Sequence, residues 1–114
     1  MKKVMLLASE DMCDILWRVL NPKYRIIPCS DPSAGGKLLE QLPEVLVLDL
    51  FLPGFNGLAF LKDHADELPP AVVVLTRFLS DPLLRELEGQ GITSMIRMPC
   101  HPDHLEQMIS EGIQ

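Results

Sequence analysis

Short runs of apolar residues alternate along this chain with longer stretches in which apolar residues recur at helical spacing. The apolar runs cover residues 4–8, 24–28, 45–48, 71–75 and 94–97. Three of these runs are continuous, which is typical of strands buried on both faces. The helical stretches carry three stripes with spacings of three and four residues. The stripes are Cys13, Leu16, Trp17 and Leu20, then Leu58, Leu61, Ala65 and Leu68, and finally Leu105, Met108 and Ile109.

Five strands alternating with five helices predict a parallel sheet covered by helices on both faces. At 114 residues the chain is large enough for one hydrophobic core, and we expect a single domain over residues 1–114. Right-handed crossovers then favour an α/β, doubly wound, flavodoxin-like (βα)5 fold with strand order 2-1-3-4-5. In such a fold the functional groups gather at the carboxyl ends of the strands, near the switch point between the first and third strands.

Helix starts are marked by proline and by short polar residues. The sequences SDPS, SDPL and HPDH each place Pro at the expected first helical position. Asp31 and Asp81 are expected N-caps for the first two of these helices, and Asn56 is the expected N-cap of the helix between them. Gly35 and Gly36 weaken the second predicted helix, because glycine disfavours a helix interior by up to about 1 kcal/mol per residue.

Charge and cysteine content limit the functional classes. The formal net charge of −6 argues against a surface in this chain that binds nucleic acid directly or binds an anionic membrane. The three cysteines are odd in number and widely spaced, so free thiols in a reducing cytosol are expected, and with them a cytoplasmic location. No apolar stretch approaches the length of a membrane span. Although Cys100, His101 and His104 stand close together, they lack a fourth zinc ligand at a useful spacing.

The third apolar run ends in the sequence VLDLFLPGFNG, residues 47–57, in which Asp49 is followed by Pro53 four residues later and by Gly57 eight residues later. The fourth run, VVVLT, ends in Thr76, and the fifth lies in GITSMIRMP, which ends in Pro99. In order and spacing these segments resemble the receiver domains of two-component response regulators, and the resemblance covers the whole chain. The alternative is a purely structural role, in which Asp49 only satisfies the amides of the turn that follows it.

This resemblance implies a role in phosphorelay signal transduction. Asp49 would be the phosphoacceptor, supplied by a histidine kinase or by a small phosphodonor. An acidic pair after the first strand would hold Mg²⁺ together with Asp49 and the backbone carbonyl of Phe51, and Thr76 and a lysine would bind the phosphoryl oxygens. Phosphoryl transfer requires charge neutralisation and positioning above all. The family also implies a cis peptide bond before Pro99.

The sequence departs from the family pattern at three places. The acidic pair should fall at Ala8 and Ser9, whereas the nearest acid is Glu10. The lysine position is Met98, and the aromatic switch position is Met95. Neither methionine carries the group that the family uses there, so the acid pair, the cation and the aromatic switch are all missing.

We therefore expect an atypical receiver that acts through protein contacts, with weak or absent phosphorylation of Asp49. At most a weak Mg²⁺ site would form from Asp49, Glu10 and the Phe51 carbonyl, and no other cofactor is expected. Arg77 either replaces the missing lysine or lies in solvent. Apart from its own phosphorylation and dephosphorylation, the chain is not expected to be an enzyme. The alternatives are a working Mg²⁺-dependent phosphoacceptor with a rearranged pocket and a flavodoxin-like cofactor-binding domain.

The surface formed by the fourth helix, the fifth strand and the fifth helix is the expected contact face for an output domain, another protein partner or a second copy of the chain. Family members commonly use this surface for such contacts. Here it should include Met95 and Arg97 from the strand, with Arg85 and Glu86 nearby. The alternative is that Met95 fills the space of the absent aromatic residue and Arg97 is only solvated.

Overall fold

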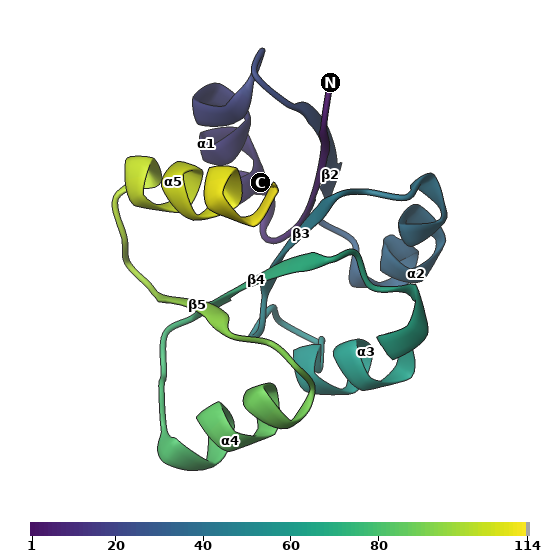
Figure 1. The fold of residues 1–114 in the computed structure, drawn as a ribbon, viewed down its shortest axis with the longest axis vertical. Coiled ribbons are helices and arrows are strands. Elements are labelled where there is room, and N and C mark those ends of the chain that lie inside the picture. The colour runs from purple at the N-terminus through teal and green to yellow at the C-terminus, as the bar shows by residue number, and fades with distance from the viewer. Residues whose placement is uncertain (114) are drawn as a thin grey trace.

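A computed structural model describes residues 1–113 and contains a five-stranded parallel sheet of order β2-β1-β3-β4-β5 (Figure 1). The strands are β1 (Lys3–Leu7), β2 (Arg25–Cys29), β3 (Val45–Asp49), β4 (Ala71–Thr76) and β5 (Ser94–Arg97). The α-helices are α1 (Glu10–Leu20), α2 (Gly35–Leu38), α3 (Gly57–Asp63), α4 (Asp81–Gly89) and α5 (Pro102–Ile113). The predicted flavodoxin-like fold and strand order are thus confirmed.

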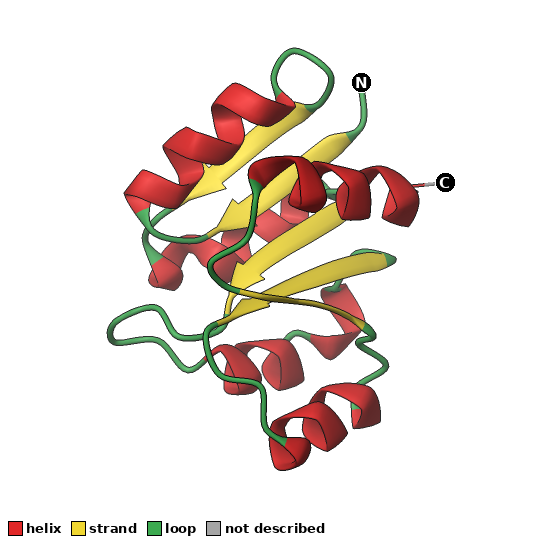
Figure 2. Ribbon diagram, turned by 90° about the vertical axis from the view of Figure 1, so that its left-hand side faces the viewer, coloured by secondary structure: helices red, strands yellow, loops and turns green. Residues whose placement is uncertain are grey.

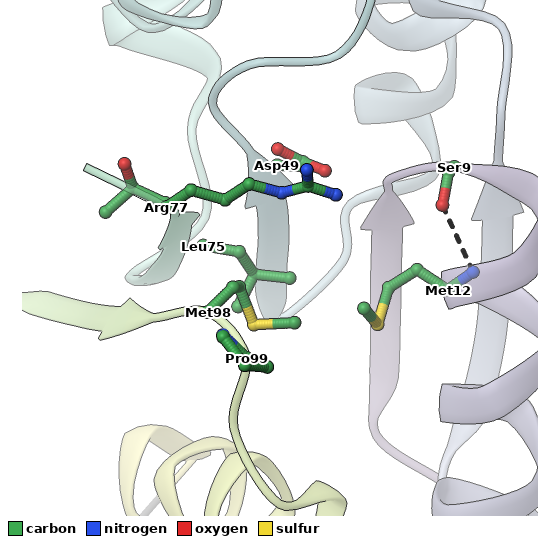
Figure 3. A pocket seen from close by; sticks show the side chains of 8 residues that line it. Ser9, Met12, Asp49, Leu75, Arg77, Met98 and Pro99 are labelled. Carbon is green, nitrogen blue, oxygen red and sulfur yellow. Dashed lines mark hydrogen bonds between the residues drawn. The ribbon is translucent and has the colours of Figure 1, made fainter.

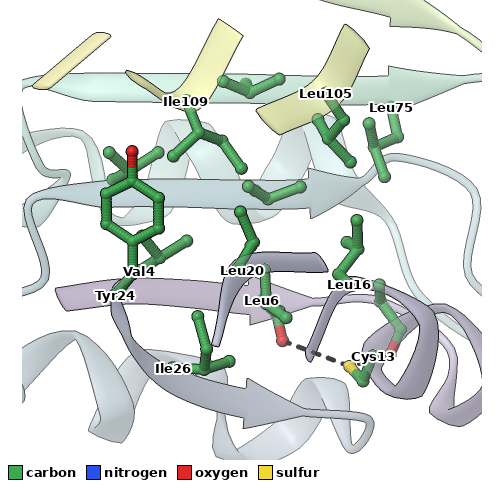
Figure 4. Packing of buried hydrophobic residues seen from close by; sticks show 14 of the residues in the cluster. Val4, Leu6, Cys13, Leu16, Leu20, Tyr24, Ile26, Leu75, Leu105 and Ile109 are labelled. Atoms are coloured by element: carbon green, nitrogen blue, oxygen red, sulfur yellow. Dashed lines mark hydrogen bonds between the residues drawn. The ribbon is translucent and has the colours of Figure 1, made fainter. Parts of the chain in front are cut away.

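Helices cover both faces of the sheet (Figure 2). Helices α1 and α5 pack on one face, and α2, α3 and α4 pack on the other. On the first face, side chains from β1 and β3, including Val4, Leu6 and Val47, meet Leu16 of α1 and Leu105 of α5 (Figure 4). The residues that alternate with them along the strands form a second buried cluster on the opposite face. Burial on both faces explains the continuous apolar runs of the central strands.

Three short 3₁₀ turns interrupt the expected helical stretches. They are η1 (Pro32–Ala34), η2 (Leu39–Gln41) and η3 (Ala65–Glu67). The second helix is reduced to the four residues of α2, between η1 and η2. Its two glycines allow close packing, because a Cβ on Gly35 would lie 3.0 Å from the Phe60 ring and one on Gly36 would lie 2.7 Å from the His64 ring. These glycines weaken the helix but bring it close to α3.

Two of the predicted N-caps are confirmed and one is wrong. Asp31 accepts a hydrogen bond from the backbone N–H of Ser33 at 3.0 Å, and Asn56 accepts one from Ala59 at 3.1 Å. Asp81, by contrast, is already helical, and Ser80 caps α4 by accepting the N–H of Leu83. Ser80 has the extended backbone that an N-cap residue adopts, and this explains the displacement by one residue.

Two of the predicted apolar stripes contain errors. Cys13, Leu16 and Leu20 of α1 are buried in the core against the sheet, whereas Trp17 is 44% exposed and lies outside this core. The helix α3 ends at Asp63, so the stripe does not continue through Ala65 to Leu68. Leu68 precedes a proline and is extended, as steric contact with the proline ring requires. Among the helices of residues 1–113, none is long and apolar enough to cross a membrane.

Candidate functional site

A cleft of about 460 Å³ opens at the carboxyl edge of the sheet, where β1, β3, β4 and β5 end (Figure 3). It is lined by Ser9, Met12, Asp49, Leu75, Thr76, Arg77, Met98 and Pro99. A second hollow of about 390 Å³ adjoins it and shares Ser9, Asp49 and Arg77. The remaining lining of this hollow is Phe51, Leu52, Pro53 and Phe78. As predicted, Asp49 and Thr76 thus lie at the same edge, where they line one cleft.

Asp49 is the last residue of β3 and is half-buried. Its Oδ1 accepts a hydrogen bond from the backbone N–H of Phe51 at 3.1 Å. This bond satisfies one turn amide, as the structural interpretation of Asp49 proposes. The hydrogen bonds described for residues 1–113 leave Asp49 Oδ2 without a protein donor. One oxygen therefore holds the turn, while the other is available at the cleft.

Pro53 and Gly57, the two residues that the family pattern specifies after Asp49, each have a steric reason for their position. The N–H of Phe55 donates to the carbonyl of Leu52 at 3.0 Å, with Pro53 and Gly54 between them and a φ of 70° at Gly54. This is the geometry of a type II turn, which favours proline followed by glycine. At Gly57, a Cβ would lie 2.8 Å from the backbone carbonyl oxygen of Leu50. Only glycine therefore allows α3 to begin this close to the end of β3.

Thr76 ends β4 and is buried. Its hydroxyl donates to the carbonyl of Phe78 at 2.7 Å and accepts the N–H of the same residue at 3.2 Å. Both functions of the hydroxyl are thus used within the loop that follows β4. In this arrangement the hydroxyl is not directed to a ligand beside Asp49.

The segment after β1 brings no carboxylate to the cleft. Ala8 is fully buried, and Ser9 lines the cleft while its Oγ accepts the N–H of Met12 as the N-cap of α1. Glu10 is exposed in the first turn of α1 and is not among the residues that line either hollow. Within residues 1–113 no three His, Cys, Asp or Glu side chains are placed to hold a metal ion together. The donor set at Asp49 thus fits Mg²⁺ poorly, because it offers a single carboxylate.

Met98 occupies the position where the family carries a lysine and gives the cleft an apolar wall. Its side chain packs against the core between the sheet and helices α1 and α5, and its Sδ lies 3.5 Å from Cys100 Sγ. The Met98–Pro99 peptide bond is cis, as the family resemblance implies. The backbone N–H of Met98 donates to the carbonyl of Thr76 at 2.7 Å, which ties the end of β5 to the end of β4.

Arg77 is exposed and follows β4 directly. Figure 3 shows its side chain extending from the end of β4 toward Asp49 at the end of β3. The ion pairs described for residues 1–113 do not include one between these two residues. A positive and a negative side chain therefore face the same cleft without neutralising each other at contact distance.

An aromatic pair that was not predicted from the sequence lies at this site. The rings of Phe51 and Phe78 meet edge to face, with centroids 6.2 Å apart, although they belong to the loops after β3 and β4. Phe51 is 52% exposed and Phe78 is 71% exposed. Each residue lies two positions after the last residue of its strand, and this shared position was the signal in the sequence.

The cysteines and the CHPDH segment serve local structure. Burial raises the pKa of the Cys13, Cys29 and Cys100 thiols, and all three are free. His101 Nδ1 accepts the backbone N–H of Asp103 at 3.1 Å at the start of α5. This bond is a capping interaction at the start of α5.

The predicted contact face lies along β5, which is an edge strand. Met95 is partly buried and packs against the core on the side of α4, and Arg97 and Arg85 are exposed. Glu86 forms an ion pair of 3.5 Å with Lys62 of α3. Met95 thus fills space inside the domain, which is the alternative role considered for it above. The arginines supply the exposed part of this face.

Curated proteins similar to this chain include a transcriptional regulatory protein and methylesterase/glutaminase proteins. The hydrogenase transcriptional regulatory protein HoxA of Cupriavidus necator is 29% identical over 104 residues, covering 89% of this chain and 22% of that protein. A protein-glutamate methylesterase/protein-glutamine glutaminase of Pseudomonas syringae pv. tomato is 36% identical over 108 residues, covering 86% of this chain and 30% of that protein. The chain thus spans less than a third of the length of these relatives. No family model matches it.

Solved structures match the fold over nearly the whole chain. The N-terminal domain of the nisin resistance regulator NsrR, a lantibiotic response regulator, has a TM-score of 0.85 at 16% identity and covers 99% of this chain and 98% of its own. The Vibrio cholerae chemotaxis protein CheY4 has a TM-score of 0.85 at 19% identity and covers 97% of this chain and 98% of its own. The receiver domain of Klebsiella pneumoniae RstA has a TM-score of 0.83 at 19% identity, with 100% and 99% covered. The strand order, the Asp-Pro-Gly turn and these similarities together show that the chain has the fold of a response-regulator receiver domain.

Proposed function

We propose that this chain is an atypical receiver that regulates an effector through protein contacts, with weak or absent phosphorylation of Asp49. The composition of the cleft at Asp49 supports this proposal, because Ser9 and Met98 stand in place of an acid and a lysine. A phosphoryl group on Asp49 would add negative charge that neither residue can neutralise. Among the cationic side chains of residues 1–113, Arg77 alone lines this cleft.

The relatives suggest how such contacts would be used. The chain corresponds to a minor part of a transcriptional regulatory protein and of methylesterase/glutaminase proteins. We infer that the activity named for these relatives belongs to the remaining length, so the receiver would act on an attached or separate effector. A histidine kinase would be its phosphodonor only if Asp49 accepts phosphate.

The contact face that we propose consists of α4, β5 and α5. As an edge strand, β5 has unpaired backbone groups along one side, and such edges need a cover or a partner. Arg85 and Arg97 are exposed on this face, and arginine is enriched at the energetic centres of protein interfaces. We propose that this face forms a homodimer or binds an effector without requiring phosphorylation.

Sedimentation velocity of the wild type and of Arg97→Glu tests this proposal. A concentration-dependent dimer in the wild type, weakened in the variant, is the expected result, because the substitution reverses a charge at the centre of the face. Arg25→Glu on β2, the opposite edge strand, is the matched control and should sediment like the wild type. If the wild type stays monomeric at high concentration and Arg97→Glu binds a candidate effector normally, this face has no such role.

A further inference from the structure

The cleft at Asp49 has the make-up of a site for a small organic molecule. Met12, Leu75, Met98 and Pro99 give it apolar walls, and the adjoining hollow ends at Phe51 and Phe78. Its volumes of about 460 and 390 Å³ lie in the usual range of small-molecule pockets, about 300–1,000 Å³. Such pockets combine apolar walls with a few polar groups that fix the orientation of the ligand. We propose that the cleft binds a free apolar α-amino acid, a small zwitterion with an aromatic or aliphatic body.

The two charges in the cleft determine the ligand class. Asp49 and Arg77 both line the cleft and the adjoining hollow, and no ion pair between them is described within residues 1–113. Asp49 Oδ2 can accept from an ammonium group, while the Arg77 guanidinium can bind a carboxylate in a bidentate arrangement. A zwitterion satisfies both charges at once. A ligand with only a negative charge would be repelled by Asp49, and a ligand with only a positive charge would be repelled by Arg77.

The remaining polar groups agree with this assignment. The Thr76 hydroxyl donates to and accepts from the backbone of Phe78, so it offers little to an incoming anion. The Ser9 Oγ accepts from Met12, which leaves its hydroxyl hydrogen free to donate. Ser9 can therefore add one hydrogen bond to the ligand carboxylate.

The aromatic pair supplies a place for the apolar body of the ligand. The Phe51 and Phe78 rings keep large exposed fractions, 52% and 71%, although they already contact each other edge to face. Exposed apolar clusters beside a cleft commonly mark a binding site, and aromatic rings gain from further edge or face contacts. A phenyl or branched aliphatic side chain in the hollow would cover part of both rings.

This proposal goes beyond the proposed contact function and does not depend on it, because it concerns the cleft at the carboxyl ends of the strands and not the α4–β5–α5 face. Titration of the ¹⁵N-labelled protein with L-phenylalanine, followed by amide NMR shifts, tests it. Saturable shifts are expected at Asp49, Arg77 and Phe78. Three truncated probes, 2-phenylethylamine, 3-phenylpropanoate and glycine, each lack one of the three features and should bind at least about tenfold more weakly, as expected for loss of a charged hydrogen bond or of the buried ring.

Charge variants identify which group meets which end of the ligand. Arg77→Gln should weaken L-phenylalanine and strengthen 2-phenylethylamine, because it removes the cation that repels this probe. Asp49→Asn should weaken L-phenylalanine and strengthen 3-phenylpropanoate, because it removes the anion that repels this probe. Arg25→Gln, far away on β2, is the matched control and should bind all four probes as the wild type does. The proposal is overturned if L-phenylalanine causes no saturable shifts in the cleft, or if all four probes bind equally. The sedimentation result is independent of either outcome.

Discussion

The hydroxyl of Thr76 donates to the carbonyl oxygen of Phe78 at 2.7 Å and accepts the backbone N–H of the same residue at 3.2 Å. Both bonds are local, so the hydroxyl stabilises the loop after β4. The same loop holds Arg77 at the cleft and places the Phe78 ring against Phe51. A phosphoryl group on Asp49 would have to compete with Phe78 for this hydroxyl.

Restoring the missing charges should raise the rate and the extent of Asp49 phosphorylation. With acetyl phosphate and Mg²⁺, the wild type should show slow and incomplete phosphorylation of Asp49 by intact-mass spectrometry. The double variant Ser9→Asp, Met98→Lys should be phosphorylated faster, because it adds a second carboxylate for the metal and a cation for the phosphoryl oxygens. Aspartate is also a good N-cap, so the start of α1 should be kept.

The same double variant with Asp49→Asn is the control for this experiment and should gain no phosphate. Rapid and stoichiometric phosphorylation of the unmodified protein would contradict the argument that the site is degenerate.

Gly57→Ala should destabilise the protein. The added Cβ would lie 2.8 Å from the carbonyl oxygen of Leu50 and 2.9 Å from its Cα, and these backbone atoms belong to the segment that follows β3. Overpacking of this kind typically costs about 1–3 kcal/mol in the free energy of unfolding. Urea denaturation measures it. Gly89→Ala at the end of α4 is the matched control, because its Cβ would meet nothing within 4 Å, and it should stabilise by up to about 1 kcal/mol.

Gln90→Leu should stabilise the protein. Within residues 1–113, both polar atoms of the Gln90 side chain are buried without a hydrogen-bond partner, which typically costs about 1–3 kcal/mol. Leucine has a similar volume and removes that cost, so the free energy of unfolding should rise by about 1 kcal/mol or more. Gln107→Leu on the exposed side of α5 is the control, because the Gln107 amide already bonds Glu111 at 3.3 Å. A loss of stability in Gln90→Leu would show that the amide has a partner in solution.

The Asp31 cap should make stability depend on pH. Its carboxylate accepts hydrogen bonds from the Ser33 hydroxyl at 2.7 Å and from the Ser33 N–H at 3.0 Å, and these bonds hold the pKa of Asp31 below its usual range. A lowered pKa in the folded state stabilises the protein above the unfolded pKa, about 4, and this stabilisation is lost as the pH falls through the folded value. Asp31→Asn keeps a capping oxygen but cannot titrate.

Thermal denaturation at several pH values measures this effect. The difference in stability between the wild type and Asp31→Asn should be largest near neutral pH and should shrink progressively in acid below about pH 4. A difference that stays constant over this range would mean that the ionised carboxylate has no advantage over the amide.

Much of the fold could be predicted because its determinants are short-range. Apolar runs marked every strand to within one residue, and Asp31 and Asn56 were identified as caps from residues adjacent in sequence. The position of Asp49 at the end of a buried strand also placed it at the carboxyl edge of the sheet. These features depend on residue type and spacing, which can be read without knowing what lies across the fold.

The tertiary structure decided where distant segments meet. Trp17 belongs to an apolar stripe but is exposed and lies outside the core against the sheet. The Phe51–Phe78 contact and the shared cleft of Asp49 and Arg77 join two loops that follow adjacent strands, β3 and β4. Spacing along the chain determines which residues share a face or a strand end. The direction of an exposed side chain, and whether a hydroxyl bonds its own loop or faces a cleft, depend on packing between segments far apart in sequence.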